Sequence, residues 1–181
     1  MSDFEYVRNY VTKDAQPFIL RPANILDKEM IINNICSVCA EKIFLPTDNF
    51  LPTNEWQKVL DQFVDEDGGN LLIVAQVGED IVGHLRLFPM WFGAKGRHVG
   101  EIGIVIVQAW RERGIGKAML AYALDWAQFA KFQKLTASVF ATNSRAINLF
   151  LLYNFTREGY RPAQFLVEGQ YVGEVLVGRF V

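Results

Sequence analysis

The chain has 181 residues, of which 18 are Lys or Arg and 20 are Asp or Glu, so its formal net charge is −2. Its length indicates a single domain, and a hydrophobic content of 51% excludes a disordered chain, which would be poor in apolar residues. The near balance of charges argues against a dedicated nucleic-acid-binding protein, which usually carries a basic excess.

The first residues of the chain differ in pattern from the rest. Residues 1–17 are polar and show no sustained hydrophobic period, so we interpret them as an extension of one domain that spans residues 18–181. The acidic residues near the start and the lack of an apolar stretch there argue against a signal peptide. No run reaches the roughly 18 apolar residues that a membrane helix needs. We therefore expect a cytoplasmic protein without a membrane partner.

The first half of the domain is predicted to contain a strand, two helices and a hairpin. Residues 18–20 predict a short apolar strand, and Asp27 fits the N-cap of an amphipathic helix. A proline-containing loop separates this helix from a second one, for which Asn54 fits the N-cap. Residues 71–77 and 81–88 then predict two strands joined by a three-residue turn.

The second half alternates strands with helices. Residues 99–107 predict a strand, and residues 116–132 a long helix that is apolar on nearly every face, which indicates burial against a sheet. The remaining elements are a strand at 135–141, a helix at 143–153 and two strands near 155–160 and 171–180. This order implies an α/β (α+β) fold with a mixed sheet covered by helices.

The two cysteines, Cys36 and Cys39, lie in the first predicted helix and cannot form a disulfide framework. A lone Cys-x-x-Cys without a second pair or a nearby histidine is weak support for zinc or redox chemistry. We expect two thiols on a partly buried helix face and no metal site.

The segment 102–117 carries the clearest functional signal, because an apolar strand runs through a loop with Gly114 and Gly116 into a helix. The first N–H groups of a helix are unpaired, and the helix dipole adds partial positive charge there. Glycines let an anion approach the backbone closely. Three basic side chains outnumber one acidic side chain: Arg111, Arg113 and Lys117 against Glu112. The segment therefore predicts a site for a phosphate or pyrophosphate group.

Two common phosphate motifs do not fit this segment. The Walker loop requires Ser or Thr after its lysine, but Ala118 follows Lys117. The dinucleotide fingerprint requires a third glycine where Met119 stands. From these residues alone, a surface turn with incidental charges stays open as the simpler interpretation.

Two further stretches add a resemblance to a family. Residues 111–116 resemble the Arg/Gln-x-x-Gly-x-Gly/Ala signature of the GNAT superfamily of N-acetyltransferases. Residues 143–150 resemble the family's Asn-x-x-Ala-Ile-x-Leu-Tyr helix, and residues 169–172 its Asp-Gly-x-Tyr hairpin in members that act on small amines. The resemblance extends over about residues 18–181. It implies a largely antiparallel central sheet of about six to seven strands, helices on both of its faces, and acetyl-CoA as the cosubstrate.

The resemblance also implies which residues bind acetyl-CoA. The end of the strand would meet the pantetheine arm, and the amides of the following loop would hold the pyrophosphate. Asn143 would bond the pantetheine or acyl region, a role compatible with its position as a helix N-cap. The expected cosubstrate-binding residues are Ile106, Val107, Arg111, Arg113, Gly114, Ile115, Gly116, Lys117, Ala118 and Asn143.

The implied reaction is direct attack of a neutral amine on the thioester, with a backbone N–H near Ile106 as the donor to the oxyanion. The chain departs from the family at Phe150, which replaces the usual tyrosine acid. Tyr153 lies one helical turn later and could substitute as the acid, or it could be a packing residue with its hydroxyl in water. The thiolate could also leave unaided, because a thiol has a pKa of about 8.5.

Glu101 is the leading candidate for the base. Strand alternation places it on the face opposite Ile104 and Ile106, and a solvated carboxylate with no catalytic role is equally consistent with the sequence. His84 and His98 are weaker candidates. Ser138 occupies a position where members that acetylate protein N-termini often carry glutamate, which argues against that substrate. Four aromatic residues lie on loops expected near the acceptor cleft: Phe44, Phe50, Trp91 and Phe92.

We therefore expect an N-acetyltransferase that transfers the acetyl group of acetyl-CoA to a primary amine of a small molecule, with no metal and no nucleic-acid partner. One alternative is a non-catalytic acyl-CoA-binding sensor or partner domain, which Phe150 favours. Another is an acetyltransferase that acts on a protein amine. A nucleic-acid contact at the anion loop is disfavoured because no wider basic stretch occurs. A homodimer that pairs through the last strands or the sheet edge stays open.

Overall fold

The computed structural model describes residues 4–50, 64–65, 69–90 and 93–181. In these residues the strands are β1 (Arg8–Val11), β2 (Pro17–Pro22), β3 (Val64–Asp65), β4 (Asn70–Val77), β5 (Asp80–Pro89), β6 (Val99–Ile106), β7 (Lys134–Phe140), β8 (Thr156–Val167) and β9 (Gln170–Phe180). The helices are α1 (Lys28–Cys39), α3 (Ile115–Phe129) and α4 (Ser144–Leu152), with short 3-10 turns at Ile25–Asp27, Gly93–Gly96 and Gln108–Trp110.

The strands form one sheet in the order β1-β2-β4-β5-β6-β7-β9-β8, with β3 paired to β4. Among the described strand pairs, β6 and β7 are parallel and the others antiparallel. This confirms the mixed, largely antiparallel sheet expected from the sequence. The described part has nine strands rather than six to seven, because the short strands β1 and β3 lack an apolar alternation long enough to be recognised.

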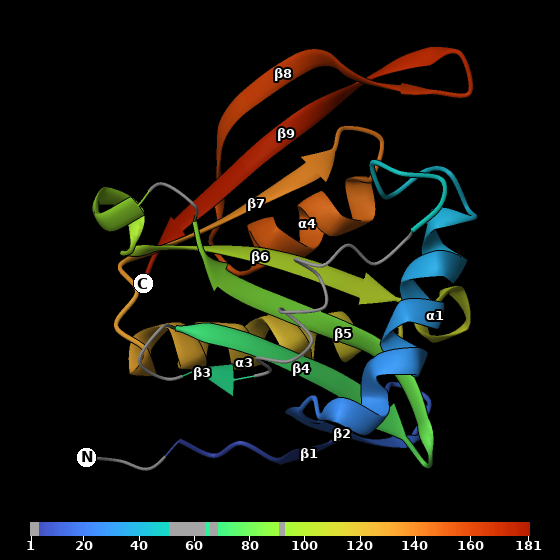
Figure 1. Cartoon of the computed structure of the whole chain (residues 1–181), viewed down its shortest axis with the longest axis vertical. Helices are drawn as coiled ribbons and strands as arrows, with labels where there is room; N and C mark the ends of the chain where they lie inside the picture. The colour runs from blue at the N-terminus through green and yellow to red at the C-terminus, as the bar shows by residue number, and fades with distance from the viewer. Residues whose placement is uncertain (1–3, 51–63, 66–68, 91–92) are drawn as a thin grey trace.

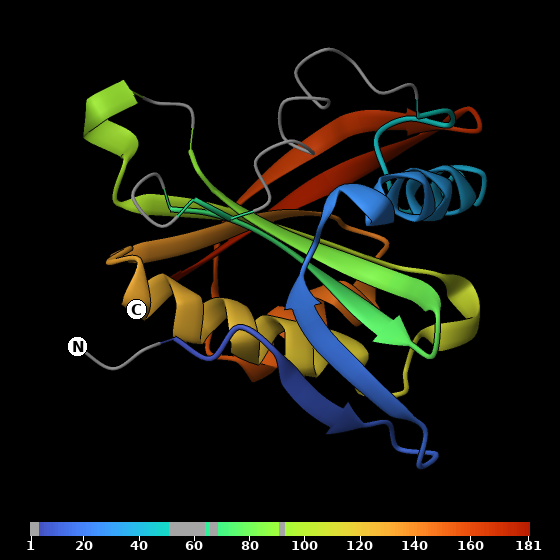
Figure 2. The ribbon, with the colours of Figure 1, turned by 60° about the horizontal axis from the view of Figure 1, so that its bottom comes forward.

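Helices cover both faces of the sheet, with α1 on one side and α3 and α4 on the other (Figure 2). The larger core lies under α3 and α4, where Tyr122 and Trp126 are fully buried. A smaller core lies under α1 and includes Ile31 and Leu72. The predicted helix that begins near Asn54 lies outside the described residues. No helix in the described ranges is long and apolar enough to cross a membrane.

The N-terminal segment joins the sheet, which differs from its expected place as an extension. Strand β1 pairs antiparallel with β2, and Phe4 and Tyr6 lie with their ring centroids 5.3 and 6.1 Å from that of Trp126. The aromatic side chains supply this packing in a stretch too short and too polar to show a hydrophobic period.

Asp27 precedes α1 as expected, but its carboxylate does not cap that helix. It accepts hydrogen bonds from the Asn24 N–H at 2.8 Å and from the two terminal nitrogens of Arg21 at 2.7 and 2.8 Å. Burial alone would raise the pKa of Asp27, but these hydrogen bonds outweigh burial and hold the pKa below its usual value. Asp27 therefore fixes the turn between β2 and α1.

Strands β6 and β7 pair over only three residues at their beginnings and then separate (Figure 1). The last pair joins Glu101 to Thr136. Beyond it, β7 pairs with β9, so the edge of β6 over residues 102–106 has no strand partner on its β7 side among the described residues. This gap is the feature of the fold that positions the candidate site.

Candidate functional site

A cavity of about 640 Å³ lies where the end of β6 meets the first turns of α3 and α4. The turn between β1 and β2 also reaches it. Its lining combines cationic side chains with glycines and amides: Lys13, Phe44, Ile106, Arg111, Glu112, Gly114, Gly116, Lys117, Thr142, Asn143, Ser144, Arg145, Asn148, Leu149 and Leu152. Of the expected cosubstrate-binding residues, Ile106, Arg111, Gly114, Gly116, Lys117 and Asn143 line the cavity, whereas Val107, Arg113, Ile115 and Ala118 do not.

The start of α3 offers unpaired backbone donors to this cavity. Gly114 is the N-cap, with φ of +102° that favours glycine. The N–H groups of Lys117 and Ala118 both donate to the Gly114 carbonyl, at 3.0 and 3.1 Å. The N–H groups of Gly114, Ile115 and Gly116 have no acceptor in the described part of the chain, so they can hold an anion together with the helix dipole.

Gly116 has a second role in packing. A Cβ atom at this position would lie 3.2 Å from Leu149 Cδ2 and 3.4 Å from Ile106 Cδ1. The glycine therefore lets α3 approach both α4 and the end of β6. Helix packing therefore favours glycine at this position, independently of any bound anion.

Arg111 is largely committed to other protein groups. Its two terminal nitrogens donate to the Glu41 carboxylate at 2.6 and 2.5 Å, and its Nε donates to the Ile106 carbonyl at 2.8 Å. The guanidinium also lies 4.8 Å from the ring centroid of Phe44. Arg111 thus ties the end of β6 to the segment after α1. Glu41 could not be recognised from the sequence as the partner of Arg111, because the two residues are 70 positions apart.

The other cations divide into paired and unpaired groups. Arg113 pairs with Asp14 at 2.8 Å and lies outside the cavity lining. Arg145 pairs with Glu112 at 2.9 Å. Lys13 and Lys117 line the cavity, and neither has an ion-pair partner within the described ranges. The positive charge still available to a ligand is therefore concentrated on these two lysines.

Asn143 caps α4 as predicted. Its Oδ1 accepts from the Ala146 N–H at 3.1 Å, and its Nδ2 has no acceptor among the residues that the structure describes. The side-chain amide can therefore donate into the cavity while the cap stays intact. By contrast, both backbone groups of Val107 are already used, by the Val82 carbonyl and by the Trp110 N–H.

The structure does not bring Tyr153 to this cavity. Its hydroxyl donates to the Lys117 carbonyl at 2.9 Å, and burial raises its pKa. Phe150, which replaces the family's tyrosine, is buried against Phe155 with ring centroids 5.1 Å apart. Both residues therefore act in packing in this conformation.

Glu101 lies at the closed end of the gap between β6 and β7, as the last residue of β6 that is paired with β7. Its neighbour Ile102 belongs to the core under α3 and α4, so alternation places the Glu101 side chain on the α1 face. One oxygen of its carboxylate lies 3.9 Å from a terminal nitrogen of Arg86, and the side chain is 38% exposed. A base at this point is accessible from the α1 side of the sheet.

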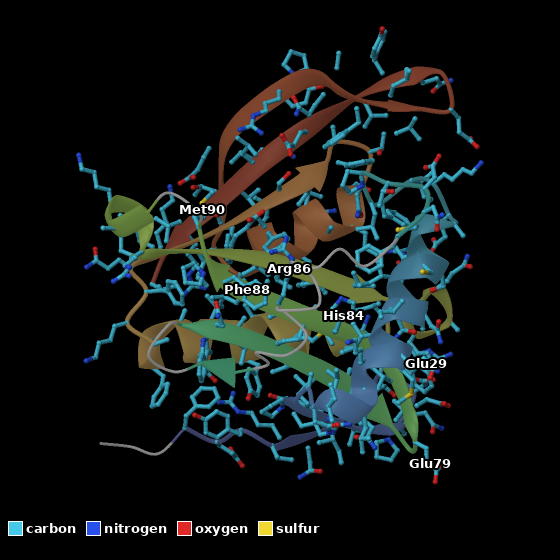
Figure 3. The ribbon with its side chains drawn as sticks, in the orientation of Figure 1. Glu29, Glu79, His84, Arg86, Phe88 and Met90 are labelled. Carbon is cyan, nitrogen blue, oxygen red and sulfur yellow. The ribbon has the colours of Figure 1, made fainter. Side chains whose placement is uncertain are left out.

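His84 and Arg86 lie two positions apart on β5, so their side chains share the face of the sheet that α1 covers (Figure 3). His84 is buried, and its Nδ1 has no hydrogen-bond partner in the described part of the molecule. Burial, with a smaller contribution from Arg86, lowers its pKa to about 4. His84 is therefore a neutral imidazole at pH 7. His98, the other histidine, precedes β6 at the opposite end from the cavity.

A carboxylate that the sequence did not point to lies beside Ser138. The Ser138 hydroxyl donates to Glu174 of β9, and Arg161 pairs with the same carboxylate at 2.8 Å. Glu174 is buried. The neighbouring strand thus supplies an acidic group where Ser138 alone suggested none, and only the β7–β9 pairing reveals it.

The loop aromatic residues and the cysteines take different places. Phe44 lines the cavity, Phe50 packs against the core under α1, and Trp91 and Phe92 lie outside the described residues. Cys39 is buried and Cys36 half-buried on α1, both as free thiols. In the described ranges, no group of three His, Cys, Asp or Glu side chains could hold a metal ion.

Comparisons with known proteins agree with this geometry. A sequence profile described as the acetyltransferase (GNAT) family matches residues 34–155. The L-amino acid N-acetyltransferase AaaT of Escherichia coli (strain K12) is 27% identical over 108 residues, which cover 59% of this chain and 66% of that relative, slightly less than two thirds.

Solved structures show the same fold. An acetyltransferase of the GNAT family from Streptococcus pneumoniae superimposes with a TM-score of 0.81 at 23% identity, over 91% of this chain and 99% of that one. The yncA putative acetyltransferase from Salmonella typhimurium, solved with acetyl-CoA, gives a TM-score of 0.81 at 16% identity, over 90% of this chain and 93% of that one.

Proposed function

The chain belongs to the acetyltransferase (GNAT) family, and we propose that it transfers the acetyl group of acetyl-CoA to the primary amine of a small molecule. Membership confirms the expected enzyme class, an acyltransferase with acetyl-CoA as its cosubstrate. The observation that carries the proposal is the row of unpaired N–H groups at Gly114–Gly116, which opens beside the free edge of β6.

The residues present fit acetyl-CoA. The N–H groups of Gly114–Gly116 and the Lys117 side chain would hold the pyrophosphate. The free edge of β6 would meet the pantetheine arm, and the Asn143 Nδ2 would donate to it. From Ile106 back to Glu101 the strand spans about 17 Å at roughly 3.3 Å per residue. The gap therefore leads from the cavity to the candidate base.

Acetyl-CoA supplies an activated acyl group as a thioester. Glu101 accepts a proton from the ammonium group of the acceptor, so that the amine reaches the thioester carbonyl in its neutral, nucleophilic form. A backbone N–H on the free edge of β6, on the Glu101 side of Ile106, donates to the oxygen that gains negative charge. Tyr153, the acid proposed from the sequence, could protonate the departing thiolate only if its hydroxyl left the Lys117 carbonyl and moved to the thioester; otherwise the thiolate leaves unaided.

The α1 face of the sheet favours an amino acid as the acceptor. Arg86 presents a half-buried guanidinium beside Glu101, so the two side chains could bind the carboxylate and the ammonium group of one small molecule. The name of the relative AaaT states that it acts on L-amino acids. We therefore propose L-amino acids as the first acceptors to test.

We also propose that the protein forms a homodimer and that it is located in the cytoplasm.

Phe150 favours a second candidate function, because a buried phenylalanine cannot donate a proton. A chain without an acid could bind acyl-CoA as a sensor or partner domain and transfer no acetyl group. Measurement of CoA binding and of turnover separates the two functions.

The test combines calorimetric titration with CoA and a colorimetric assay of thiol release from acetyl-CoA over a panel of L-amino acids and simple primary amines. We expect CoA binding and thiol release with at least one amino acid. Glu101→Gln should then lower kcat by about a hundredfold or more with CoA affinity retained. Binding without turnover on any acceptor would support the sensor domain, and lack of CoA binding would overturn both functions.

A further inference from the structure

The turn between β1 and β2 is docked on the loop that precedes α3. The Lys13 N–H donates to the Arg113 carbonyl at 3.0 Å, and the Asp14 carboxylate pairs with the Arg113 guanidinium at 2.8 Å. That guanidinium also lies 4.7 Å from the ring centroid of Trp110. Backbone and side-chain contacts thus join the β1–β2 turn to the loop before α3, although the two segments are about a hundred positions apart in the sequence.

The turn itself has a defined shape. Thr12 is buried, and its hydroxyl donates to Asp14 at 2.7 Å and accepts from the Gln16 N–H at 2.9 Å. The Thr12 N–H donates to the Gln16 carbonyl at 2.8 Å. These hydrogen bonds close a turn that fixes the backbone of Lys13. Lys13 is therefore presented from an ordered turn rather than from a free N-terminal arm.

Lys13 is among the residues that line the cavity in which the α3 N–H groups open. Of the four cations in that lining, Arg111 and Arg145 are paired with carboxylates. Lys13 and Lys117 are the two without an ion-pair partner in the part of the chain that the structure describes. A phosphate-bearing ligand in the cavity would therefore meet Lys13 as one of two uncompensated charges.

We propose that Lys13 is a cosubstrate-binding residue that pairs with a phosphate group of CoA. This inference rests on the acetyl-CoA site proposed above. Lys13 lies outside the part matched by the family profile, residues 34–155, so the N-terminal hairpin adds to the site a contact that the family motifs do not contain. Asp14 and Arg113 act as positioning residues, because they hold the turn on the loop.

The experiment compares Lys13→Met with the wild-type chain in calorimetric or competition binding of three ligands. CoA carries a pyrophosphate and a 3′-phosphate, dephospho-CoA lacks the 3′-phosphate, and pantetheine lacks all phosphates. We expect Lys13→Met to raise the Kd for CoA about three- to tenfold, as an exposed charge-assisted contact would, with no change for pantetheine. Lys13→Arg should retain most of the affinity.

The dephospho-CoA arm identifies the phosphate that is contacted. If the loss in Lys13→Met persists with dephospho-CoA, Lys13 pairs with the pyrophosphate; if the loss disappears, Lys13 pairs with the 3′-phosphate. Either result supports a phosphate contact. Far-UV circular dichroism and urea unfolding establish that the variant is folded.

Lys95→Met is the matched control. It removes the same charge from the 3-10 turn Gly93–Gly96, which precedes β6 at the end remote from the cavity. An equal loss of CoA affinity in Lys95→Met, or an unchanged CoA affinity in Lys13→Met, would overturn the inference. If the wild-type chain itself fails to bind CoA, the proposed function fails instead, so the two failures are distinguishable.

Discussion

Glu41→Gln would remove the bidentate partner of Arg111 and leave the guanidinium partly buried without a counter-charge. The two side chains are 13% and 19% exposed, and two hydrogen bonds of 2.6 and 2.5 Å join them. Breaking a fully buried pair from one side costs about 3–5 kcal/mol, whereas an exposed pair contributes about 0.2–1 kcal/mol. We expect a coupling free energy of about 2 kcal/mol, or a factor of about 30 in the unfolding equilibrium.

The assay is a double-mutant cycle in urea, with Glu41→Gln, Arg111→Gln and the double variant. The matched control is the pair Arg113–Asp14 on the same loop, whose side chains are 36% and 50% exposed; its coupling should stay below about 1 kcal/mol. If the Arg111–Glu41 coupling is no larger than the control coupling, the assignment of Arg111 as the residue that fastens the end of β6 is refuted.

Three further predictions concern other parts of the structure. Gly114→Ala and Gly78→Ala each place a side chain at positive φ in open space, so each should lose about 1 kcal/mol of stability in urea, but only Gly114→Ala should raise the Kd for CoA; an unchanged Kd would contradict the loop assignment. Burial lowers the pKa of His84 from 6.5 to about 4. Between pH 6.5 and 4 the unfolded chain therefore binds a proton at His84 that the folded chain does not bind. The free energy of unfolding should fall by about 3 kcal/mol over this range of pH. His84→Gln should abolish that part of the pH dependence, and an unaltered pH profile would argue against a buried neutral imidazole. Tyr153→Phe removes the hydrogen bond to Lys117 and should cost about 1 kcal/mol of stability; a fall in kcat of tenfold or more would support Tyr153 as the acid, and a kcat within twofold of wild type would exclude that role.

The local parts of the site could be predicted from the sequence. The Gly114 N-cap and the helix start at Ile115 could be recognised because the candidate anion site is formed by consecutive residues at a helix N-terminus. Asn143 was recognisable as a cap for the same reason, since a cap bonds an N–H only three residues away.

The distant parts could not be predicted. Lys13 and Glu41 reach the site through strand pairing and an ion pair across long stretches of chain, and neither carries a local pattern. The sequence shows the positive charge of Arg113 but not that Asp14 pairs with its guanidinium. A single sequence shows which charges are present and does not show which of them are already paired.

We propose that the start of α3 and the free edge of β6 bind acetyl-CoA with its thioester near Glu101. A crystal structure of the acetyl-CoA complex tests it most directly. We expect pyrophosphate oxygens within hydrogen-bond distance of the N–H groups of Gly114–Gly116, and the pantetheine arm between β6 and β7. Acetyl-CoA bound elsewhere, or a pantetheine arm that does not enter the gap ending at Glu101, would contradict it.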